Sequence, residues 1–129
     1  MSKPAVIIVS HSGKIADGVY DLAAQTKQPD VEVYAAGGTE DGGIGTSADK
    51  IQNALQQADN EAGMLVFYDI GSALMNAELA LDMLPDLEGS VEIVNAPIVE
   101  GTYVAVVEAG MGKSLEETAA AVRRQQFVE

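Results

Sequence analysis

The chain has 129 residues, 47% hydrophobic and 21% charged, which is enough to bury a core and excludes a mainly disordered chain. It has no cysteine and one histidine, so disulfides and thiolate metal sites are excluded and a zinc site lacks ligands. Twenty acidic against seven basic residues give a net charge of −13, which disfavours nucleic acids and anionic membranes as partners. We therefore expect one domain over residues 1–129, without a metal or cofactor.

No segment has the pattern of a targeting or membrane-spanning sequence. Only five apolar residues, Ala5 to Val9, follow Lys3 and Pro4, fewer than the roughly 7–15 of a signal peptide. No apolar run approaches the roughly 18 residues of a membrane helix. We expect a cytoplasmic protein. Its acidic surplus favours partner proteins with a basic face, although such a surplus is also typical of a plain solvated surface.

The first predicted strand covers Ala5–Val9 and stops at His11. Its continuous apolar run, rich in β-branched residues, predicts burial on both faces of a sheet. A helix is predicted from near Ile15 until Gln28-Pro29-Asp30 ends it. Its predicted inner face consists of Ile15, Val19, Leu22 and Ala23. Residues 31–35 then alternate between apolar and polar, which predicts a strand covered on one face.

A glycine-rich loop follows the second predicted strand. Five of the nine residues 37–45 are glycine, so the backbone can adopt positive φ and approach a ligand closely. Thr46 and Ser47 are good N-caps for a second helix. The predicted buried stripe of this helix is Ile51, Ala54, Leu55 and Ala58.

The third predicted strand, residues 64–68, ends at Asp69, and Gly71 and Ser72 turn the chain into a third helix that Pro85 ends. We predict that its inner face consists of Leu74, Ala77, Leu81 and Leu84. Met75 and Met83 lie at helical spacing and are interpreted as core or dimer contacts, not as a cofactor site.

The last third of the chain continues the alternation. Residues 90–94 predict a fourth strand that closes with Asn95, and a helix follows Pro97 to about Ala109. After a break at residues 110–112, the Ser114-x-x-Glu117 capping box predicts a last helix through Gln125. This order predicts an α/β fold: a doubly wound, four-stranded parallel sheet, order 2-1-3-4, with helices on both faces.

Polar groups follow each predicted strand and therefore share one edge of the sheet. They are His11 and Ser12, the loop of residues 37–47, Asp69 and Ser72, and Asn95. Ligands and chemistry in open α/β sheets sit at this carboxyl edge. We therefore expect a functional site where these side chains converge.

These residues resemble a known family. The resemblance covers nearly the whole chain and is specific to the DhaM phosphocarrier subunits of phosphotransferase-system-dependent dihydroxyacetone kinases, within the wider mannose-family IIA proteins. It rests on four motifs in order: Ser10-His11-Ser12, the glycine-rich loop of residues 37–47, Tyr68-Asp69-Ile70-Gly71-Ser72, and Asn95-Ala96-Pro97.

The resemblance implies a phosphoryl relay. His11 would accept the group from phospho-HPr and pass it to ADP on the subunit DhaL, whose partner DhaK holds dihydroxyacetone. It also implies a homodimer, for which Ile98, Val99 and Tyr103 are spare apolar residues. Because the chain ends at Glu129, the donors are expected to be separate proteins.

The resemblance and the chemistry assign roles to the site residues. An imidazole attacks phosphorus through a neutral ring nitrogen, and a carboxylate bonded to the other nitrogen would fix its tautomer. His11 is therefore the expected nucleophile, and Asp69 is expected to orient it. The hydroxyls of Ser10, Ser12 and Ser72 would hold the phosphoryl oxygens. The loop would dock DhaL and nucleotide phosphates through Gly38, Thr39, Gly42, Gly43, Gly45, Thr46 and Ser47.

Simpler alternatives stay open at this point. His11 could be an ordinary hydrogen-bonded polar residue, Asp69 could only cap the third helix, and the loop could be a flexible connection. The protein could also be a IIA component of a mannose-family sugar transporter that donates to a IIB protein. A third alternative is a flavodoxin-like binding module without chemistry, in which a His11→Ala change alters nothing.

Overall fold

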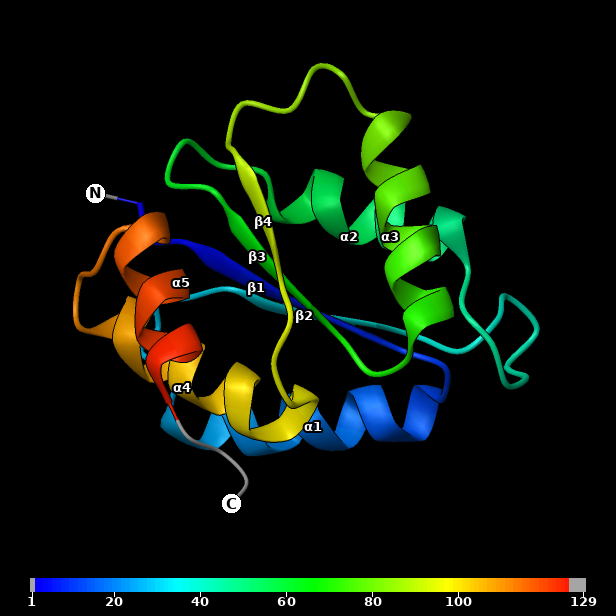
Figure 1. The fold of residues 1–129 in the computed structure, drawn as a ribbon, viewed down its shortest axis with the longest axis horizontal. Coiled ribbons are helices and arrows are strands. Elements are labelled where there is room, and N and C mark those ends of the chain that lie inside the picture. The colour runs from blue at the N-terminus through cyan, green and yellow to red at the C-terminus, as the bar shows by residue number, and fades with distance from the viewer. Residues whose placement is uncertain (1, 126–129) are drawn as a thin grey trace.

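The computed structural model describes residues 2–125, in which strands and helices alternate along most of the chain (Figure 1). The elements are β1 (Ala5–Ser10), α1 (Gly13–Thr26), β2 (Val33–Gly37), α2 (Ala48–Ala58), β3 (Met64–Tyr68), α3 (Gly71–Asp82), β4 (Val91–Val94), α4 (Ile98–Gly110) and α5 (Leu115–Arg124). None of the helices in residues 2–125 combines the length and the apolar character that crossing a bilayer requires.

The four strands form one parallel sheet in the order β2-β1-β3-β4. Ile8 of β1 pairs with Ala35 of β2 on one side and with Phe67 of β3 on the other. The predicted doubly wound topology and strand order are confirmed. Since β1 and β3 are central neighbours, the segments that leave their carboxyl ends emerge side by side.

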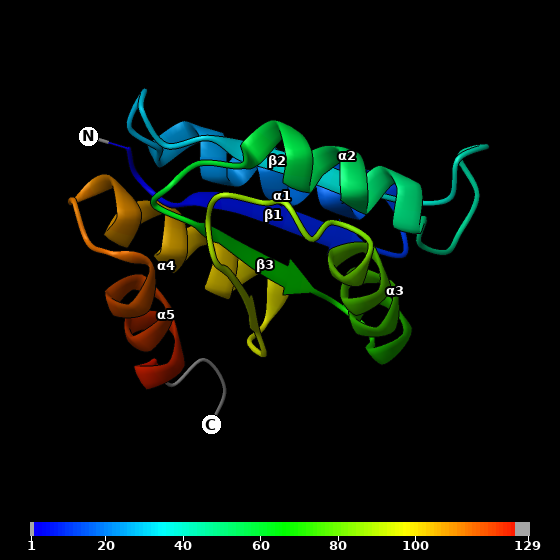
Figure 2. The same ribbon diagram turned by 90° about the horizontal axis from the view of Figure 1, so that it is seen from above.

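Helices cover both faces of the sheet, as the lack of alternation in β1 and β3 predicts. One core packs α1, α4 and α5 against Ile8 and Phe67, and the other packs α2 and α3 against Ile7 and Val66. All six residues of β1 are buried. Seen from above, α5 lies at one end of the sheet, whereas α3 and the loop before α2 lie at the other (Figure 2).

Serine side chains cap three of the helices. Ser12 accepts a hydrogen bond from the Ile15 amide at the start of α1, and Ser47 accepts one from the Lys50 amide at the start of α2. Ser114 and Glu117 form both bonds of the predicted capping box of α5. The caps of α1 and α2 fix two of the points at which the chain enters a helix beside the carboxyl edge of the sheet.

The predicted inner face of α1 is partly wrong. Ile15 and Leu22 are 48% and 51% exposed, whereas the buried residues are Ala16, Val19 and Ala23. Small side chains let the helix backbone approach the sheet closely, so the stripe of small residues faces the core while larger apolar residues stay outside. The stripe predicted for α2, by contrast, is buried as expected.

The same correction applies to α3. Ala77 is buried as predicted, but the other buried residues are Ala73 and Ala80, and Leu74, Leu81 and Leu84 are only half-buried. The interpretation of Met75 and Met83 as core residues is also wrong, because they are exposed. Three alanines again set the face on which the helix meets the sheet.

The bounds of β1, β2 and β4 differ from the prediction, and β1 extends to Ser10. Val31 is buried, but its amide bonds the Gln28 carbonyl, so the chain is still turning there. β2 therefore begins at Val33 and extends to Gly37, and β4 begins at Val91. The shift brings the end of β2 directly to the glycine-rich loop.

Gly37 ends β2 where α1 begins and has no space for a side chain. An added Cβ would lie 2.6 Å from the Ala16 Cβ and 2.8 Å from the Ser12 carbonyl oxygen. We expect Gly37→Ala to lower the free energy of unfolding by about 1–3 kcal/mol, measured by urea denaturation. Gly18→Ala is the matched control, because nothing lies within 4 Å of its added Cβ; it should be neutral or stabilising by up to about 1 kcal/mol. Equal losses in both variants would contradict the close packing at Gly37.

Candidate functional site

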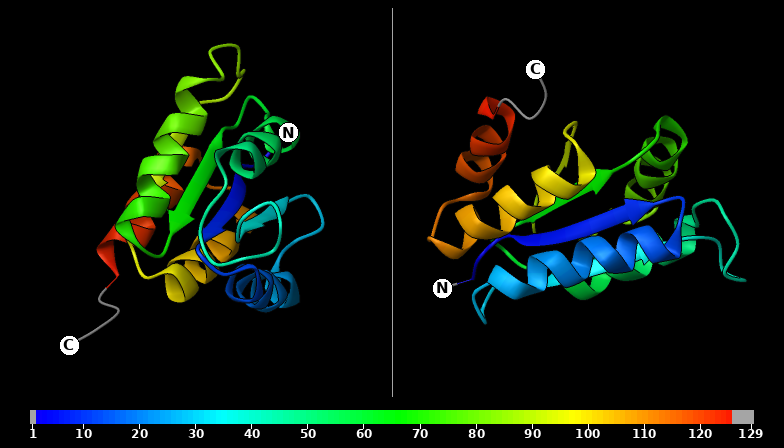
Figure 3. Two further views of the ribbon diagram at one scale, coloured as in Figure 1. Left: turned by 90° about the vertical axis from the view of Figure 1, so that its right-hand side faces the viewer. Right: turned by 90° about the horizontal axis from the view of Figure 1, so that it is seen from below.

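The carboxyl ends of β1 and β3 bring together the two residues predicted to act as a pair. Val9 pairs with Tyr68 at the end of the ladder, so His11 and Asp69 leave neighbouring strands. The left panel of Figure 3 faces this edge of the sheet, with α3 on one side and α1 and the glycine-rich loop on the other. The side chains of His11 and Asp69 are 18% and 16% exposed, so both are held in place yet remain reachable.

Asp69 accepts four hydrogen bonds. Its Oδ2 accepts from the Ser10 hydroxyl at 2.7 Å and from the His11 amide at 3.1 Å. Its Oδ1 lies 3.1 Å from the His11 Nδ1 and accepts from the Ile70 amide at 2.8 Å. Because every group around the carboxylate points a donor at it, its orientation is fixed.

These contacts also determine the charge of Asp69. Burial raises its pKa, but the hydrogen bonds from the Ser10 hydroxyl, the His11 ring and the amides of His11 and Ile70 outweigh burial. The net result is a pKa below the ordinary value for aspartate. Asp69 is therefore an anion near neutral pH and accepts the proton on Nδ1, which leaves the lone pair on Nε2.

The lowered pKa of Asp69 predicts a pH dependence of stability. The unfolded chain binds the proton at a higher pH than the folded one, so the contribution of Asp69 is complete above the ordinary aspartate pKa and is lost as pH falls through the lowered value. We expect Asp69→Asn to cost stability at pH 7 and to cost less at pH 3. Urea denaturation at both pH values measures this, and a larger cost at pH 3 would contradict the assignment.

The other ring nitrogen of His11 faces the start of α3. Nε2 lies 2.5 Å from the Ser72 hydroxyl oxygen. The N-cap of α3 is Ile70, which makes no side-chain cap bond, so the expectation that Asp69 only caps this helix finds no support. Early amides of a helix lack partners within it and favour anions. The first turn of α3 thus offers a hydroxyl and backbone amides near Nε2.

The structure places the other two serines differently from each other. Ser10 is fully buried, and its hydroxyl donates to Asp69 and accepts from the Ser12 amide. Its bonds therefore serve the carboxylate, and its contact with phosphoryl oxygens stays a prediction. Ser12 is half-buried and caps α1, but a hydroxyl that accepts one bond keeps its own proton to donate.

The glycine-rich loop is hydrogen-bonded within itself and is not merely a flexible connection. Thr39 donates to Asp41, the Gly43 amide donates to the Thr39 hydroxyl at 2.8 Å, and the Thr39 amide bonds the Gly43 carbonyl. Gly38, Gly42 and Gly45 have φ of 74°, 87° and 136°. Glycine is the residue that adopts these angles without strain, so this path depends on the glycines.

Two tethers that sequence reasoning missed attach this loop to the site. The Gly45 amide donates to the His11 carbonyl at 2.7 Å, and Asn76 of α3 donates to the Thr46 hydroxyl. Asn76 lies four residues after Ser72, one turn along the same helix face, and that spacing is the one signal that could have identified it. The loop therefore closes over the chain beside His11.

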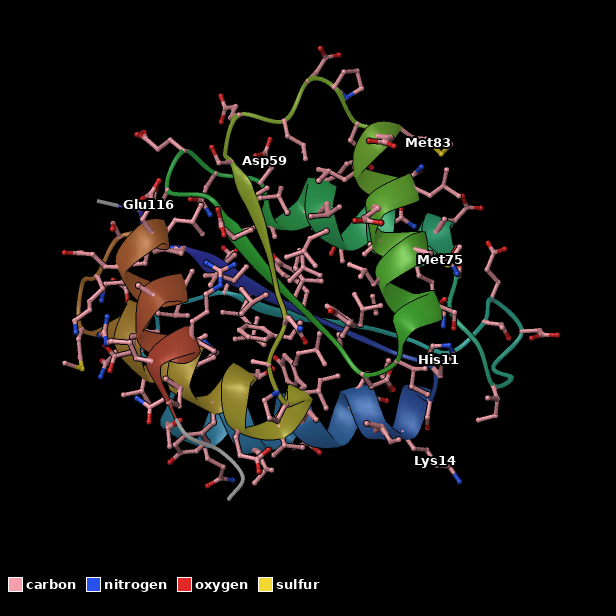
Figure 4. All side chains as sticks on the ribbon, in the orientation of Figure 1. His11, Lys14, Asp59, Met75, Met83 and Glu116 are labelled. Carbon is pink, nitrogen blue, oxygen red and sulfur yellow. The ribbon has the colours of Figure 1, made fainter. Side chains whose placement is uncertain are left out.

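Two residues expected near this edge do not join the cluster. Asn95 is exposed, and among the described residues no side-chain hydrogen bond connects it to His11 or Asp69. Lys14 follows His11 closely in sequence but is exposed and points outward (Figure 4). The site therefore holds its histidine between a carboxylate and a hydroxyl, and no cation among residues 2–125 contacts the ring.

Comparisons of sequence place the chain among phosphotransferase-system proteins. The family model described as "PTS system fructose IIA component" (EIIA-man) matches residues 5–119. The phosphoryl donor subunit DhaM of PEP-dependent dihydroxyacetone kinase 1 from Listeria innocua is 43% identical over 122 residues, covering 93% of this chain and 94% of that protein. The phosphotransferase subunit DhaM from Lactococcus lactis is 41% identical, with 81% and 83% covered.

Solved structures share the fold. A crystal structure of a protein of unknown function superposes with a TM-score of 0.85 at 32% identity, covering 98% of this chain and 97% of that one. A phosphotransferase-system EIIA component from Streptococcus agalactiae has a TM-score of 0.65 at 18% identity, covering 93% and 88%. The second likeness concerns the fold alone.

Proposed function

The chain belongs to the DhaM family of EIIA-type phosphocarriers, and from that premise we propose that His11 carries a phosphoryl group between two proteins. The relative from Listeria innocua is the phosphoryl donor subunit of a PEP-dependent dihydroxyacetone kinase, and the relative from Lactococcus lactis is the phosphotransferase subunit of a PTS-dependent one. Such a subunit is regenerated in each cycle, so its role in phosphoryl transfer is that of a carrier.

One observation carries the proposal: the Asp69 carboxylate lies against Nδ1 of His11, which leaves Nε2, beside the Ser72 hydroxyl, as the nucleophile. The lone pair of Nε2 attacks the phosphorus of the donor's phosphohistidine, a new N–P bond forms, and the donor's N–P bond breaks. The developing positive charge on the ring is balanced by the Asp69 carboxylate through Nδ1–H. The Ser72 hydroxyl then turns from Nε2 to a phosphoryl oxygen, with the first amides of α3 beside it.

We propose phospho-HPr as the donor and ADP held by DhaL as the acceptor. In the second step an oxygen of the ADP β-phosphate attacks the same phosphorus, the N–P bond to His11 breaks, and ATP forms on DhaL for the phosphorylation of the dihydroxyacetone that DhaK holds. Within the described part of the chain no cation contacts the His11 ring, which supports onward transfer because tight ionic capture would slow release. The loop of residues 38–47, tethered to His11 through Gly45, would dock the acceptor.

A relay assay with purified proteins tests this function. The phosphorylated protein is mixed either with DhaL and ADP or with a sugar-transport IIB protein. We expect ATP to form with DhaL and no label to reach the IIB protein. Transfer to the IIB protein alone would favour the sugar-transport alternative, for which the EIIA likeness at 18% identity gives no specific support.

We also propose a homodimer formed through α4. Val99 and Tyr103 on this helix are 39% and 42% exposed, and α4 directly follows the edge strand β4. Sedimentation equilibrium at micromolar concentration should give twice the chain mass of 13.4 kDa. A Tyr103→Asp variant should sediment as a monomer, and a wild-type monomer would refute the proposal.

A further inference from the structure

Three large apolar side chains form an exposed row along α3, which we call the α3 ridge: Met75, Leu79 and Met83. They are 68%, 49% and 57% exposed. Their spacing of four residues places them one turn apart on the same side of the helix. The alanines of α3 occupy the side that meets the sheet, so the ridge contributes little to the core.

The α3 ridge begins about one helical turn after the residue that contacts Nε2 of His11, the nitrogen proposed to accept the phosphoryl group. Ser72 lies three residues before Met75 and seven before Leu79, which puts its hydroxyl in line with the ridge. That hydroxyl contacts the Nε2 of His11. Figure 4 shows Met75 between His11 and Met83, with Met83 at the far end of α3. A protein bound along the ridge would therefore extend at one end to the Nε2 atom of His11.

Exposed acidic side chains lie on the same helix as this apolar row and on the loop joined to that helix. Glu78 and Asp82 are exposed on α3, and Glu40 and Asp41 are exposed on the glycine-rich loop, which the bond from Asn76 to Thr46 joins to α3. The whole chain has a net charge of −13. An apolar row with acidic neighbours fits a partner whose apolar patch is ringed by lysine and arginine. The opposite charges would attract such a partner and pair with its basic side chains once it has bound.

We propose that the α3 ridge is the docking surface for the protein that exchanges the phosphoryl group with His11, and that this protein presents an apolar patch ringed by basic side chains. The inference rests on the proposed function. A second copy of this chain is a poor occupant, since it would bring like charges together and cover Nε2. Because one ridge leads to one nitrogen, donor and acceptor would dock in turn.

Two charge-introducing variants test the ridge. Met75→Lys and Leu79→Lys should each slow phosphorylation by phospho-HPr about tenfold, measured by rapid quench, because they remove an apolar contact and repel a basic partner. Met111→Lys is the matched control. Met111 is 65% exposed at the C-terminus of α4, near the start of α5 and away from α3, so the rate should be unchanged.

A small chemical donor separates docking from chemistry. Phosphoramidate needs no protein contact, so it should label both ridge variants at the wild-type rate. The proposal that the α3 ridge is a docking surface would be overturned by any of three results. These are wild-type rates of the ridge variants with phospho-HPr, loss of their labelling by phosphoramidate, and conversion of a wild-type dimer to a monomer by Leu79→Lys. A wild-type protein labelled by neither donor would instead refute the proposed function on which the ridge depends.

Discussion

The His11→Ala variant should accept no phosphoryl group. After incubation with phosphoenolpyruvate, enzyme I and HPr, intact-mass spectra of the wild type should show a gain of about 80 daltons, and the variant should show none. The relay rate should fall by at least about 10⁴-fold, because the atom that forms the N–P bond is gone. The sequence holds no second histidine that could replace it.

His11→Gln is the companion variant for this experiment. Its side chain keeps a polar group near Asp69 and Ser72 but has no nucleophilic nitrogen, so it should fold and remain inactive. Circular dichroism and thermal melting should show both variants folded, since the His11 side chain lies at the rim of the structure. A mass gain in either folded variant would contradict the assignment of His11.

The Asp69→Asn variant should fold but transfer slowly. Asp69 accepts four hydrogen bonds on its two oxygens. Asparagine replaces one of these oxygens with an NH₂ group, which cannot accept the hydrogen bonds from the donors around it. Either the Ser10 hydroxyl or the Nδ1–H group of His11 then loses its acceptor, and in the second case the ring loses its fixed tautomer. We expect the phosphorylation rate to fall by about 10²–10⁴-fold.

Asp59→Asn is a matched control for that variant. Asp59 also accepts two backbone bonds, from the amides of Glu88 and Gly89, but it lies far from His11 (Figure 4). This substitution should lower stability without changing the rate of phosphorylation, measured by rapid quench. A wild-type rate for Asp69→Asn, or an equal slowing by Asp59→Asn, would contradict the orienting role of Asp69.

The sheet and the pairing of His11 with Asp69 could be predicted because local patterns carry them. Unbroken apolar runs identify β1 and β3, and each run ends in a polar residue at the same edge of a parallel sheet. The resemblance to one family added the roles of these residues. Neither inference required knowledge of long-range contacts.

The rest depended on contacts that leave no local pattern. The bond from the Gly45 amide to the His11 carbonyl joins two backbones, so no side chain reports it. The burial of Ser10 behind Asp69 depends on both neighbours of β1. The buried faces of α1 and α3 differ from the predicted ones because the helical spacing of apolar residues does not show which of them pack on the sheet, where small alanines fit closest.

The most direct test is to locate the phosphoryl group in the phosphorylated wild-type protein. Nuclear magnetic resonance of protein labelled with ¹⁵N in histidine distinguishes a phosphorus bonded to Nε2 from one bonded to Nδ1. The contact between Nδ1 and Asp69 predicts that the phosphorus is on the Nε2 of His11. Phosphorus on Nδ1, or on any residue other than His11, would contradict the account.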